Sequence, residues 1–476
     1  MTQQSKHWND DFFAPGVNPG AVRTYFDRVK NAPDGGEIHT LAVWKDGKQL
    51  LRVAAAPYHC TDKREIHSLS KIFSSTAIGF LYDDGLVDLQ DKIVDIFRDR
   101  IDYPVAPGAE KMTLRHVLAM STGHSGCILP EMIETTDVVR AFLQHPLDYG
   151  APGCPQRYST AASCILGAVV THLTGMSLMD FMECRLFYPL GMEQMRWCGT
   201  ADGHAVAGAG LRANLDDILK LGRLYLQQGQ WEGRQILSAD WVRLATSEQS
   251  WNGYHDSDFS NGYGLHWWRC YPDGFRGDGA LGQLCLVYPA QRAVVALQGY
   301  MEEMGVAMRQ SRTLLEELFD DVQPAEPVVY APLPASAQPV PIAPGIYRFE
   351  ENAFGWTQLR VQPEADGTLR LQISDGTTQQ MLRCGNGVYT ENTVWMKKLT
   401  PKLLGRLRDE DTECVRLAAC WGTEGTGTLR IGVRFLSSVY PEEWELSERD
   451  GVLQWDFCNQ NTRREDARSL RARKLV

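Results

Sequence analysis

Residues Glu65–Ile93 read EIHSLSKIFSSTAIGFLYDDGLVDLQDKI, and this stretch decides the fold. Ser68 and Lys71 stand three positions apart near its start, and the apolar residues that follow recur at helical spacing up to a stop at Asp84 and Gly85. This spacing predicts an amphipathic helix that begins at Ser68. Residues three apart on a helix lie on the same face, so we expect the serine hydroxyl and the lysine amine within hydrogen-bond reach of each other.

A serine hydroxyl is a weak nucleophile until a nearby base accepts its proton. A lysine that is partly removed from water at the floor of a pocket loses affinity for its own proton and can serve as that base. The first turn of a helix also presents backbone N–H groups that stabilise an oxyanion. The spacing of Ser68 and Lys71 therefore suits an activated nucleophile, although the same spacing also occurs at solvated helix starts.

The segments on either side predict one antiparallel sheet with helices on it. Thr40–Ala55 alternates apolar and polar residues around Asp46 and Gly47, which is typical of a β-hairpin. Helical patterns then dominate, strand patterns return between residues 262 and 300, and a last helical pattern covers Gly305–Val322. This order predicts an α+β fold with an antiparallel sheet, flanking helices and a helical insertion over roughly residues 86–240.

The composition changes after residue 322. Prolines punctuate residues 323–343, which predicts a semi-rigid linker. Residues 344–476 alternate apolar and polar positions between glycine turns, and their tryptophans include Trp356, Trp395, Trp444 and Trp455. We therefore expect a first domain at residues 1–322, the linker, and an antiparallel all-β domain at residues 344–476.

Composition and charge narrow the range of partners. The 476 residues carry a net charge of −11, which disfavours nucleic acid and an anionic membrane. The first residues lack a secretory signal pattern and no apolar run reaches membrane-spanning length, so a cytoplasmic location is expected. The 12 cysteines are scattered without a C-x-x-C pair, which predicts reduced thiols, and the histidines show no metal-ligand spacing. We expect no metal and no other cofactor.

Two further motifs follow in order along the chain. Tyr158, Ser159 and Thr160 precede a glycine-closed helix, and FRGDGALGQLCLVYP (Phe275–Pro289) is a glycine-rich turn that enters a strand. Together with the serine and lysine, these motifs resemble the serine β-lactamase and penicillin-binding-protein superfamily, most closely its class C-like branch of esterases, D-aminopeptidases and β-lactamase-related hydrolases. The resemblance covers roughly residues 36–320.

The resemblance implies a role for each catalytic group. Ser68 is the nucleophile that becomes acylated, Lys71 accepts its proton, and Tyr158 carries a proton to the leaving group. The oxyanion of the reacting carbonyl would lie between the backbone N–H groups of Ser68 and Ala280.

Two departures from the family pattern concern substrate binding. The tyrosine motif usually ends in asparagine, whereas Thr160 offers one hydrogen-bond donor instead of two. The glycine-rich motif usually supplies a lysine or histidine where Gly277 stands, so the cation that would hold a β-lactam or D-alanine carboxylate is missing unless Arg276 replaces it. We expect substrate contacts from five residues, Thr160, Arg276, Gly277, Asp278 and Gly279. Asp278 is expected to cap the bend between its two glycines, and the alternative is that it faces the pocket and binds a cationic amine.

These motifs predict a serine hydrolase that cleaves an ester or amide bond of a small molecule or peptide through an acyl-enzyme. An acyltransferase would use the same acyl-enzyme but exclude water, and a catalytically silent binding or sensing protein is a third interpretation. By similarity to related D-aminopeptidases, the C-terminal domain is expected to be a lipocalin-like barrel. Such a barrel would narrow access to the pocket or form a contact in a homo-oligomer, and a separate domain with neither role is an equal alternative.

Overall fold

The computed structural model describes most of the chain, namely residues 9–33, 35–125, 128–252, 258–270, 273–330, 332–395, 414–424, 427–458 and 468–475. The described residues form two compact units. The first unit lies within Met1–Ala54 and Cys60–Val328, and the second unit contains Ala55–His59 and the residues from Val329 onward. The domain boundaries at residues 322 and 343 stay predictions.

A seven-stranded antiparallel sheet forms the centre of the first unit, in the order β1-β3-β2-β12-β11-β10-β9. The hairpin predicted around Asp46 and Gly47 joins β2 to β3, and both turn residues have the positive φ of a two-residue turn, 51° and 83°. β12 pairs with β2, so the early hairpin and the strands that come late in the chain form one sheet. The strands are β1 (Asn9–Phe13), β2 (Glu37–Lys45), β3 (Lys48–Ala54), β9 (Trp268–Cys270), β10 (Gly274–Gly279), β11 (Gln283–Tyr288) and β12 (Ala293–Tyr300).

Helices cover both faces of this sheet. α10 (Leu215–Leu226) packs closely on one face, where a β-carbon on its Gly222 would lie 2.6 Å from Val294 Cγ1 and 2.8 Å from Cys285 Sγ. α12 (Gly305–Glu317) covers the opposite face together with α1 (Pro19–Lys30), and Tyr288 on that face exchanges a 2.7 Å hydrogen bond with Ser311. Because both faces are covered, the central strands β11 and β12 are buried along nearly their whole length.

The helix predicted from Ser68 begins two residues later. His67–Leu69 forms a 3₁₀ turn, and α2 runs over Ser70–Asp83. Every residue of α2 from Ser70 to Leu81 is buried, so the predicted polar face is wrong. Its hydroxyls are instead hydrogen-bonded inside the unit: Ser75 donates to the carbonyl of Leu265 at 2.7 Å, for example, and this satisfies the polar group without water.

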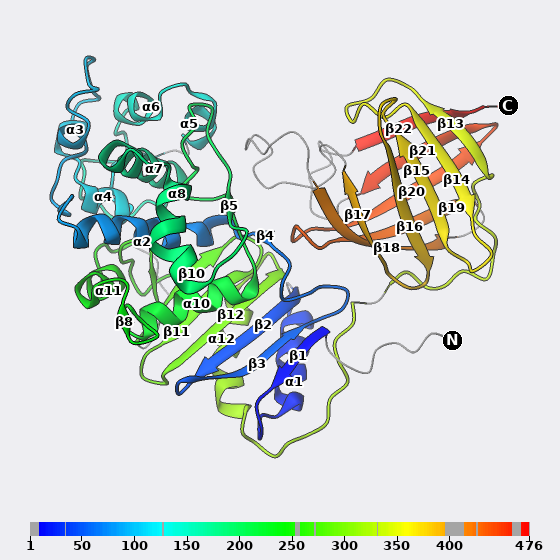
Figure 1. Cartoon of the computed structure of the whole chain (residues 1–476), viewed down its shortest axis with the longest axis horizontal. Helices are drawn as coiled ribbons and strands as arrows, with labels where there is room; N and C mark the ends of the chain where they lie inside the picture. The colour runs from blue at the N-terminus through cyan, green and yellow to red at the C-terminus, as the bar shows by residue number, and fades with distance from the viewer. Residues whose placement is uncertain are drawn as a thin grey trace. The chain divides into compact units, whose positions relative to one another are not determined.

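Apart from α10, most helical segments between β3 and β9 gather at one end of the sheet (Figure 1). The bounds of the helices are α3 (Ile93–Ile96), α4 (Leu114–Leu118), α5 (Leu129–Glu134), α6 (Val138–Gln144), α7 (Thr160–Thr174), α8 (Leu178–Met182), α9 (Tyr188–Leu190) and α11 (Ala239–Thr246), with short turns η2 (Ala109–Lys111) and η3 (Glu183–Phe187). Short strands β4 (Arg64–Glu65), β5 (Arg196–Trp197) and β6 (Leu211–Ala213) form a second sheet, and β7 (Gln230–Trp231) pairs with β8 (Arg234–Gln235). The predicted α+β fold with a helical insertion is confirmed.

The second unit contains a closed β-barrel. Nine strands follow one another in the order β16-β15-β14-β13-β22-β21-β20-β19-β18, and a parallel pairing of β16 with β18 closes the ring. β17 pairs with the first residues of β18 on the same side as β16, and β19 holds the opposite side. The strands are β13 (Gly345–Phe349), β14 (Gln358–Pro363), β15 (Leu369–Ser374), β16 (Gln379–Asn386), β17 (Thr390–Trp395), β18 (Cys414–Glu424), β19 (Thr428–Phe435), β20 (Pro441–Arg449), β21 (Val452–Cys458) and β22 (Arg468–Lys474). The predicted all-β barrel is confirmed.

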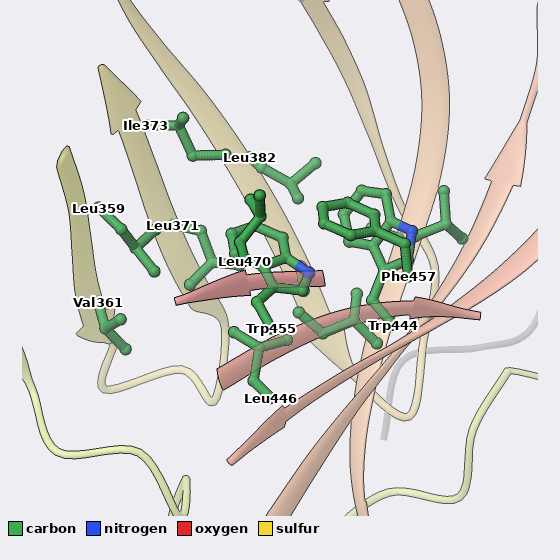
Figure 2. Close-up of a cluster of buried hydrophobic side chains, with 14 of the residues drawn as sticks. Leu359, Val361, Leu371, Ile373, Leu382, Trp444, Leu446, Trp455, Phe457 and Leu470 are labelled. Atoms are coloured by element: carbon green, nitrogen blue, oxygen red, sulfur yellow. The ribbon is translucent and has the colours of Figure 1, made fainter. Parts of the chain in front are cut away.

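Aromatic and leucine side chains form a buried cluster of the barrel unit (Figure 2). Trp455 and Phe457 point the same way from β21 and stack with their ring centroids 5.3 Å apart, and Trp444 from β20 packs against both. Three of the four tryptophans noted in the sequence are buried in this core, whereas Trp395 on β17 is exposed. The strict alternation of apolar residues that predicted the strands is therefore the inner face of the barrel.

A short loop near the start of the chain belongs to the second unit. In Ala55–His59, the carbonyl of Ala56 accepts a 2.9 Å hydrogen bond from the backbone N–H of Tyr330, and Tyr58 packs edge-on against the ring of Tyr330. The imidazole of His59 lies 2.7 Å from a carboxylate oxygen of Glu391 on β17. The second unit is thus built from two separate parts of the chain.

Within the described ranges, no single helix is long and apolar enough to cross a membrane. The pair Thr160–Thr174 and Leu178–Leu190 passes this test of length and composition together, with a bend of 77° between its two members.

Candidate active site

A buried lysine lies at the centre of the candidate site. Lys71, in the first turn of α2, is 1% exposed, and its Nζ donates hydrogen bonds to Ser68 Oγ at 3.0 Å, Thr160 Oγ1 at 3.1 Å and the carbonyl oxygen of Gly208 at 2.7 Å. These three acceptors equal the number of protons on an ammonium group. The structure thus brings the predicted Ser68, Lys71 and Thr160 into one hydrogen-bonded group.

Ser68 sits in the 3₁₀ turn just before α2, and β6 holds this turn in place. Ser70 Oγ donates to the carbonyl of His67 at 2.6 Å and accepts from the backbone N–H of Leu211 at 3.1 Å. His67 has a positive φ of 49°, which an ordinary side chain rarely adopts. The turn therefore holds a sharp bend directly before the serine, and the bend is fixed by hydrogen bonds from both sides.

Tyr158 lies over the lysine and is held by aromatic neighbours. Its ring centroid is 4.7 Å from Lys71 Nζ, and it stacks nearly parallel on Trp268 with centroids 5.6 Å apart. Although the side chain as a whole is 37% exposed, burial of the hydroxyl end and then the negative charge of Asp278 raise the pKa of Tyr158 above its usual range, while a hydrogen bond with Ser68 acts in the opposite direction. Tyr158 therefore keeps its proton at neutral pH and can donate it.

Gly208 was not predicted as part of the site. A β-carbon at this position would lie 2.7 Å from the carbonyl oxygen of Thr160 and 2.8 Å from Ser163 Cβ, so only glycine allows this backbone to reach Lys71. The sequence GAGLRA, which begins at Gly208, carries small residues but no pattern that names a lysine contact.

Strand β10 closes the site from the sheet side. A β-carbon on Gly279 would lie 2.1 Å from the carbonyl oxygen of Ile66 and 3.0 Å from the backbone nitrogen of Leu69, so the end of the strand packs directly on the turn that carries Ser68. Ala280 follows this contact and is half-buried. The geometry is consistent with an oxyanion site between the backbone N–H groups of Ser68 and Ala280, which stays a prediction.

Gly277 faces α2 and has no room for a side chain. A β-carbon there would lie 2.6 Å from Leu69 Cδ1 and 2.7 Å from Ile72 Cγ2. A lysine or histidine at this position, which the family pattern would place there, would collide with the packed start of α2. The absence of a side chain at Gly277 thus allows β10 to pack directly on the start of α2.

Arg276 and Asp278 form a buried ion pair on the opposite side of β10. Arg276 Nε donates to Asp278 Oδ2 at 2.9 Å, and the two residues are 1% and 8% exposed. The prediction that Asp278 caps a turn is wrong: Asp278 pairs with Leu284 inside the strand, and the turn follows it at Leu281, whose φ is 63°. Asp278 engages Nε of the Arg276 guanidinium, so the charge that Arg276 offers toward a substrate on Ser68 is largely neutralised.

His266 supports the lysine from behind. Its Nδ1 lies 3.2 Å from the carbonyl oxygen of Lys71, and its Nε2 lies 3.2 Å from Ser163 Oγ, so a neutral imidazole that donates from Nδ1 and accepts at Nε2 satisfies both contacts. Burial, and then the positive charge of Lys71, lower the pKa of His266 to about 3. Sequence reasoning missed this residue because no spacing connects it to the serine and lysine motif.

We expect the His266→Asn variant to lose part of the acid sensitivity of the folded chain. The folded pKa of about 3 lies below the usual 6.5, so between these values only the unfolded imidazole binds a proton. The free energy of unfolding therefore falls as the pH is lowered through this window, by up to about 1.4 kcal/mol per pH unit for this one group. Asparagine cannot bind the proton, and it tolerates the positive φ of 64° at this position.

Chemical denaturation at about pH 6 and about pH 5 should show that the free energy of unfolding depends less steeply on pH in the variant than in the parent chain. Parallel dependences in the variant and the parent chain would contradict the assignment of a neutral buried histidine.

Comparisons with known proteins place this site in a family. Penicillin-binding protein 4 of Amycolatopsis lactamdurans is 26% identical over 395 residues, which cover 73% of this chain and 98% of that protein. Lovastatin esterase of Penicillium rubens is 26% identical over 195 residues, which cover 36% of this chain and 47% of that protein. The octameric penicillin-binding protein homologue from Pyrococcus abyssi shares the fold, with a TM-score of 0.51 and 14% identity over 95% of this chain and 99% of that one.

The family model described as Beta-lactamase matches residues 39–298, which contain the serine and lysine motif, the tyrosine motif and β10. This match covers more than half of the chain and confirms the predicted superfamily, whereas the class C-like branch stays a prediction. The chain therefore belongs to the beta-lactamase family.

Proposed function

We propose that this chain cleaves an ester or amide bond of a small molecule or peptide through a covalent acyl-enzyme on Ser68. The prediction of a serine hydrolase is confirmed at the level of the family. One observation carries the finer proposal: the amine of a buried Lys71 lies 3.0 Å from Ser68 Oγ, which is within the reach required of a general base and its nucleophile.

The contacts support the following sequence of proton transfers. Lys71 has to release one proton of its ammonium group before the reaction; the neutral amine then accepts the proton of Ser68 Oγ as that oxygen bonds to the substrate carbonyl carbon. The oxyanion of the tetrahedral intermediate accepts from the backbone N–H groups of Ser68 and Ala280. Tyr158 donates its proton to the leaving alcohol or amine, and the C–O or C–N bond breaks. A water molecule then attacks the acyl group and gives a proton to the Tyr158 phenolate, and Ser68 Oγ leaves with the proton that Lys71 returns.

The charges around the leaving group favour an uncharged or cationic substrate. Asp278 is close enough to raise the pKa of the Tyr158 hydroxyl, and it also engages Arg276. Gly277 leaves no room for the cation that would hold a substrate carboxylate. A carboxylate on the leaving group would therefore lie near Asp278 without a cation placed to hold it, which supports an esterase or amidase acting on substrates without that group.

A cytoplasmic location and assembly into a homo-oligomer also stay proposals. Free thiols support a reducing compartment, since Cys60, Cys285 and Cys384 are buried and free among the described cysteines. The octameric state is stated of the Pyrococcus abyssi protein, whose fold this chain shares, and it supports an oligomer here.

The proposed function is tested by labelling the full chain with a fluorophosphonate and measuring its intact mass. We expect one adduct on the parent chain and none on Ser68→Ala. The reason is that the hydroxyl of Ser68 lies 3.0 Å from Lys71 Nζ, the base that activates it in the proposal. Ser125→Ala is the matched control, since Ser125 donates to Asp148 and should not change the adduct. An adduct that survives Ser68→Ala would refute the proposal, and products formed with an added alcohol or amine would instead identify an acyltransferase.

Lys71 should act through proton acceptance, so Lys71→Arg should fail nearly as completely as Lys71→Ala. Arginine keeps the positive charge but does not lose its proton. Loss of a general base typically costs roughly two to four orders of magnitude in the rate of acylation. Stopped-flow measurement of acylation by a chromogenic ester gives this rate. Substantial acylation by the arginine variant would show that the lysine contributes only its charge.

Asp278→Asn should relax the discrimination against anionic leaving groups. We expect the ratio of kcat/KM for a carboxylate-bearing ester to that for its uncharged analogue to rise about tenfold, because one nearby negative charge is removed. Asp278→Glu keeps the charge and should keep the low ratio, and Asp46→Asn, at the β2–β3 turn, is a control for general changes in charge. Equal ratios in all four proteins would remove Asp278 from the determinants of specificity.

A further inference from the structure

A cavity lies across β10 from α2. It has a volume of about 530 Å³, and its lining includes Arg276, Leu286 and Tyr288 from the sheet. Arg276 is the cross-strand partner of Leu286, so both point to the same face, whereas the neighbouring Gly277 faces α2. Tyr288 is hydrogen-bonded to α12, which supplies Met308, Arg309 and Arg312 to the lining. The cavity therefore opens between the edge of the sheet and α12.

The lining is rich in positive charge for a chain with a net charge of −11. Three guanidinium groups line the cavity, from Arg276, Arg309 and Arg312, together with one carboxylate, from Asp258. Asp258 pairs with Arg309, and Arg312 Nη2 lies 3.9 Å from the nearest oxygen of Asp273. At that distance the Arg312 guanidinium keeps hydrogen-bonding capacity for a ligand.

The buried Arg276 has an unused donor. Its Nε donates to Asp278, and its Nη1 donates to the carbonyl of Asp258 at 3.0 Å, but Nη2 has no hydrogen-bond partner among the described residues. A guanidinium that is 1% exposed and incompletely bonded is costly, because each buried donor without a partner loses its hydration. An acceptor in the adjoining cavity would supply the missing partner.

The rest of the lining is suited to an organic group. Leu286 and Met308 are buried apolar side chains, and the ring of Tyr288 lies under the guanidinium of Arg312 at 5.2 Å from the ring centroid. The lining also includes the polar residues Ser260 and Asn261, and cavities of several hundred Å³ that combine apolar walls with a few polar and charged groups commonly bind small organic molecules. An inorganic anion would leave these apolar walls uncovered.

We propose that this cavity binds a small organic carboxylate, whose charged group faces Arg312 and Arg276 and whose apolar part packs on Leu286 and Met308. The carboxylate would complete the hydrogen bonding of the arginine that also holds Asp278. The proposal does not depend on the acyl-enzyme, because β10 separates the cavity from α2 and Ser68.

Calorimetric titration of hexanoate into the full-length Ser68→Ala variant tests this site without turnover. We expect one binding site, and we expect Arg312→Met and Met308→Trp each to weaken binding by about tenfold, the first by removing a charge-assisted hydrogen bond and the second by filling the cavity. Arg312→Met keeps the proposal testable if the larger substitution fails to fold. Arg292→Met is the matched control, because Arg292 is 75% exposed and pairs with Asp46 at the β2–β3 turn.

Hexanol should not bind, because it lacks the carboxylate. Absence of hexanoate binding, or equal affinity in the two cavity variants and the control, would overturn the proposal. Tighter binding of inorganic phosphate than of hexanoate would overturn the organic part of the assignment.

Discussion

The site depends on how the protein accommodates one buried cation. An ammonium group removed from water is costly unless acceptors surround it, and Lys71 finds them in three segments: the turn before α2, the start of α7 and the backbone ahead of β6. Each acceptor has to approach within about 3 Å, so the positions of these segments are linked. Ser68, the proposed nucleophile, is one of the three acceptors, and its position therefore follows from the solvation of the lysine.

The two faces of β10 are packed in different ways. Toward α2 the strand presents Gly277 and Gly279, and backbone lies against backbone without intervening side chains. Toward α12 it presents Arg276 and Asp278, which neutralise each other where water is excluded. The side nearest the serine is thus shaped by the absence of side chains, and its electrostatic character comes from charges attached to the other face.

Local interactions made much of the arrangement predictable. The contact of Ser68 with Lys71 joins residues three apart on one turn. The β2–β3 hairpin needs only Asp46 and Gly47 at its turn. In both cases a short stretch of sequence is enough to predict the structure. The alternation of apolar residues in the barrel is local in the same sense. Pairings between distant segments were beyond such reasoning: Gly208 lies 137 positions from Lys71, and His266 lies 195 positions from it.

Two predictions failed because tertiary structure outweighed local preference. The amphipathic pattern of α2 predicted a polar face in contact with water. In the structure, Ser75 on this helix instead donates a hydrogen bond to the carbonyl of Leu265, just before β9, and needs no water. The glycines around Asp278 favoured a bend, yet pairing with β11 holds the segment extended and moves the bend to Leu281. In both cases the deciding partner lies outside the window from which the preference is judged.

The loop Ala55–His59 ties an early part of the chain to a late one, and this affects synthesis. A ribosome completes this loop well before Val329 and Tyr330, with which Ala56 and Tyr58 pair in the finished protein. At roughly 5–20 residues per second the interval is on the order of tens of seconds. Until then Tyr58, which is fully buried in the folded chain, lacks the ring of Tyr330. A chain whose synthesis stops after β12 lacks Val329 and Tyr330, so Ala56 and Tyr58 have no partners from this part of the chain. Chaperones and proteases that recognise exposed apolar side chains would distinguish it from the complete product.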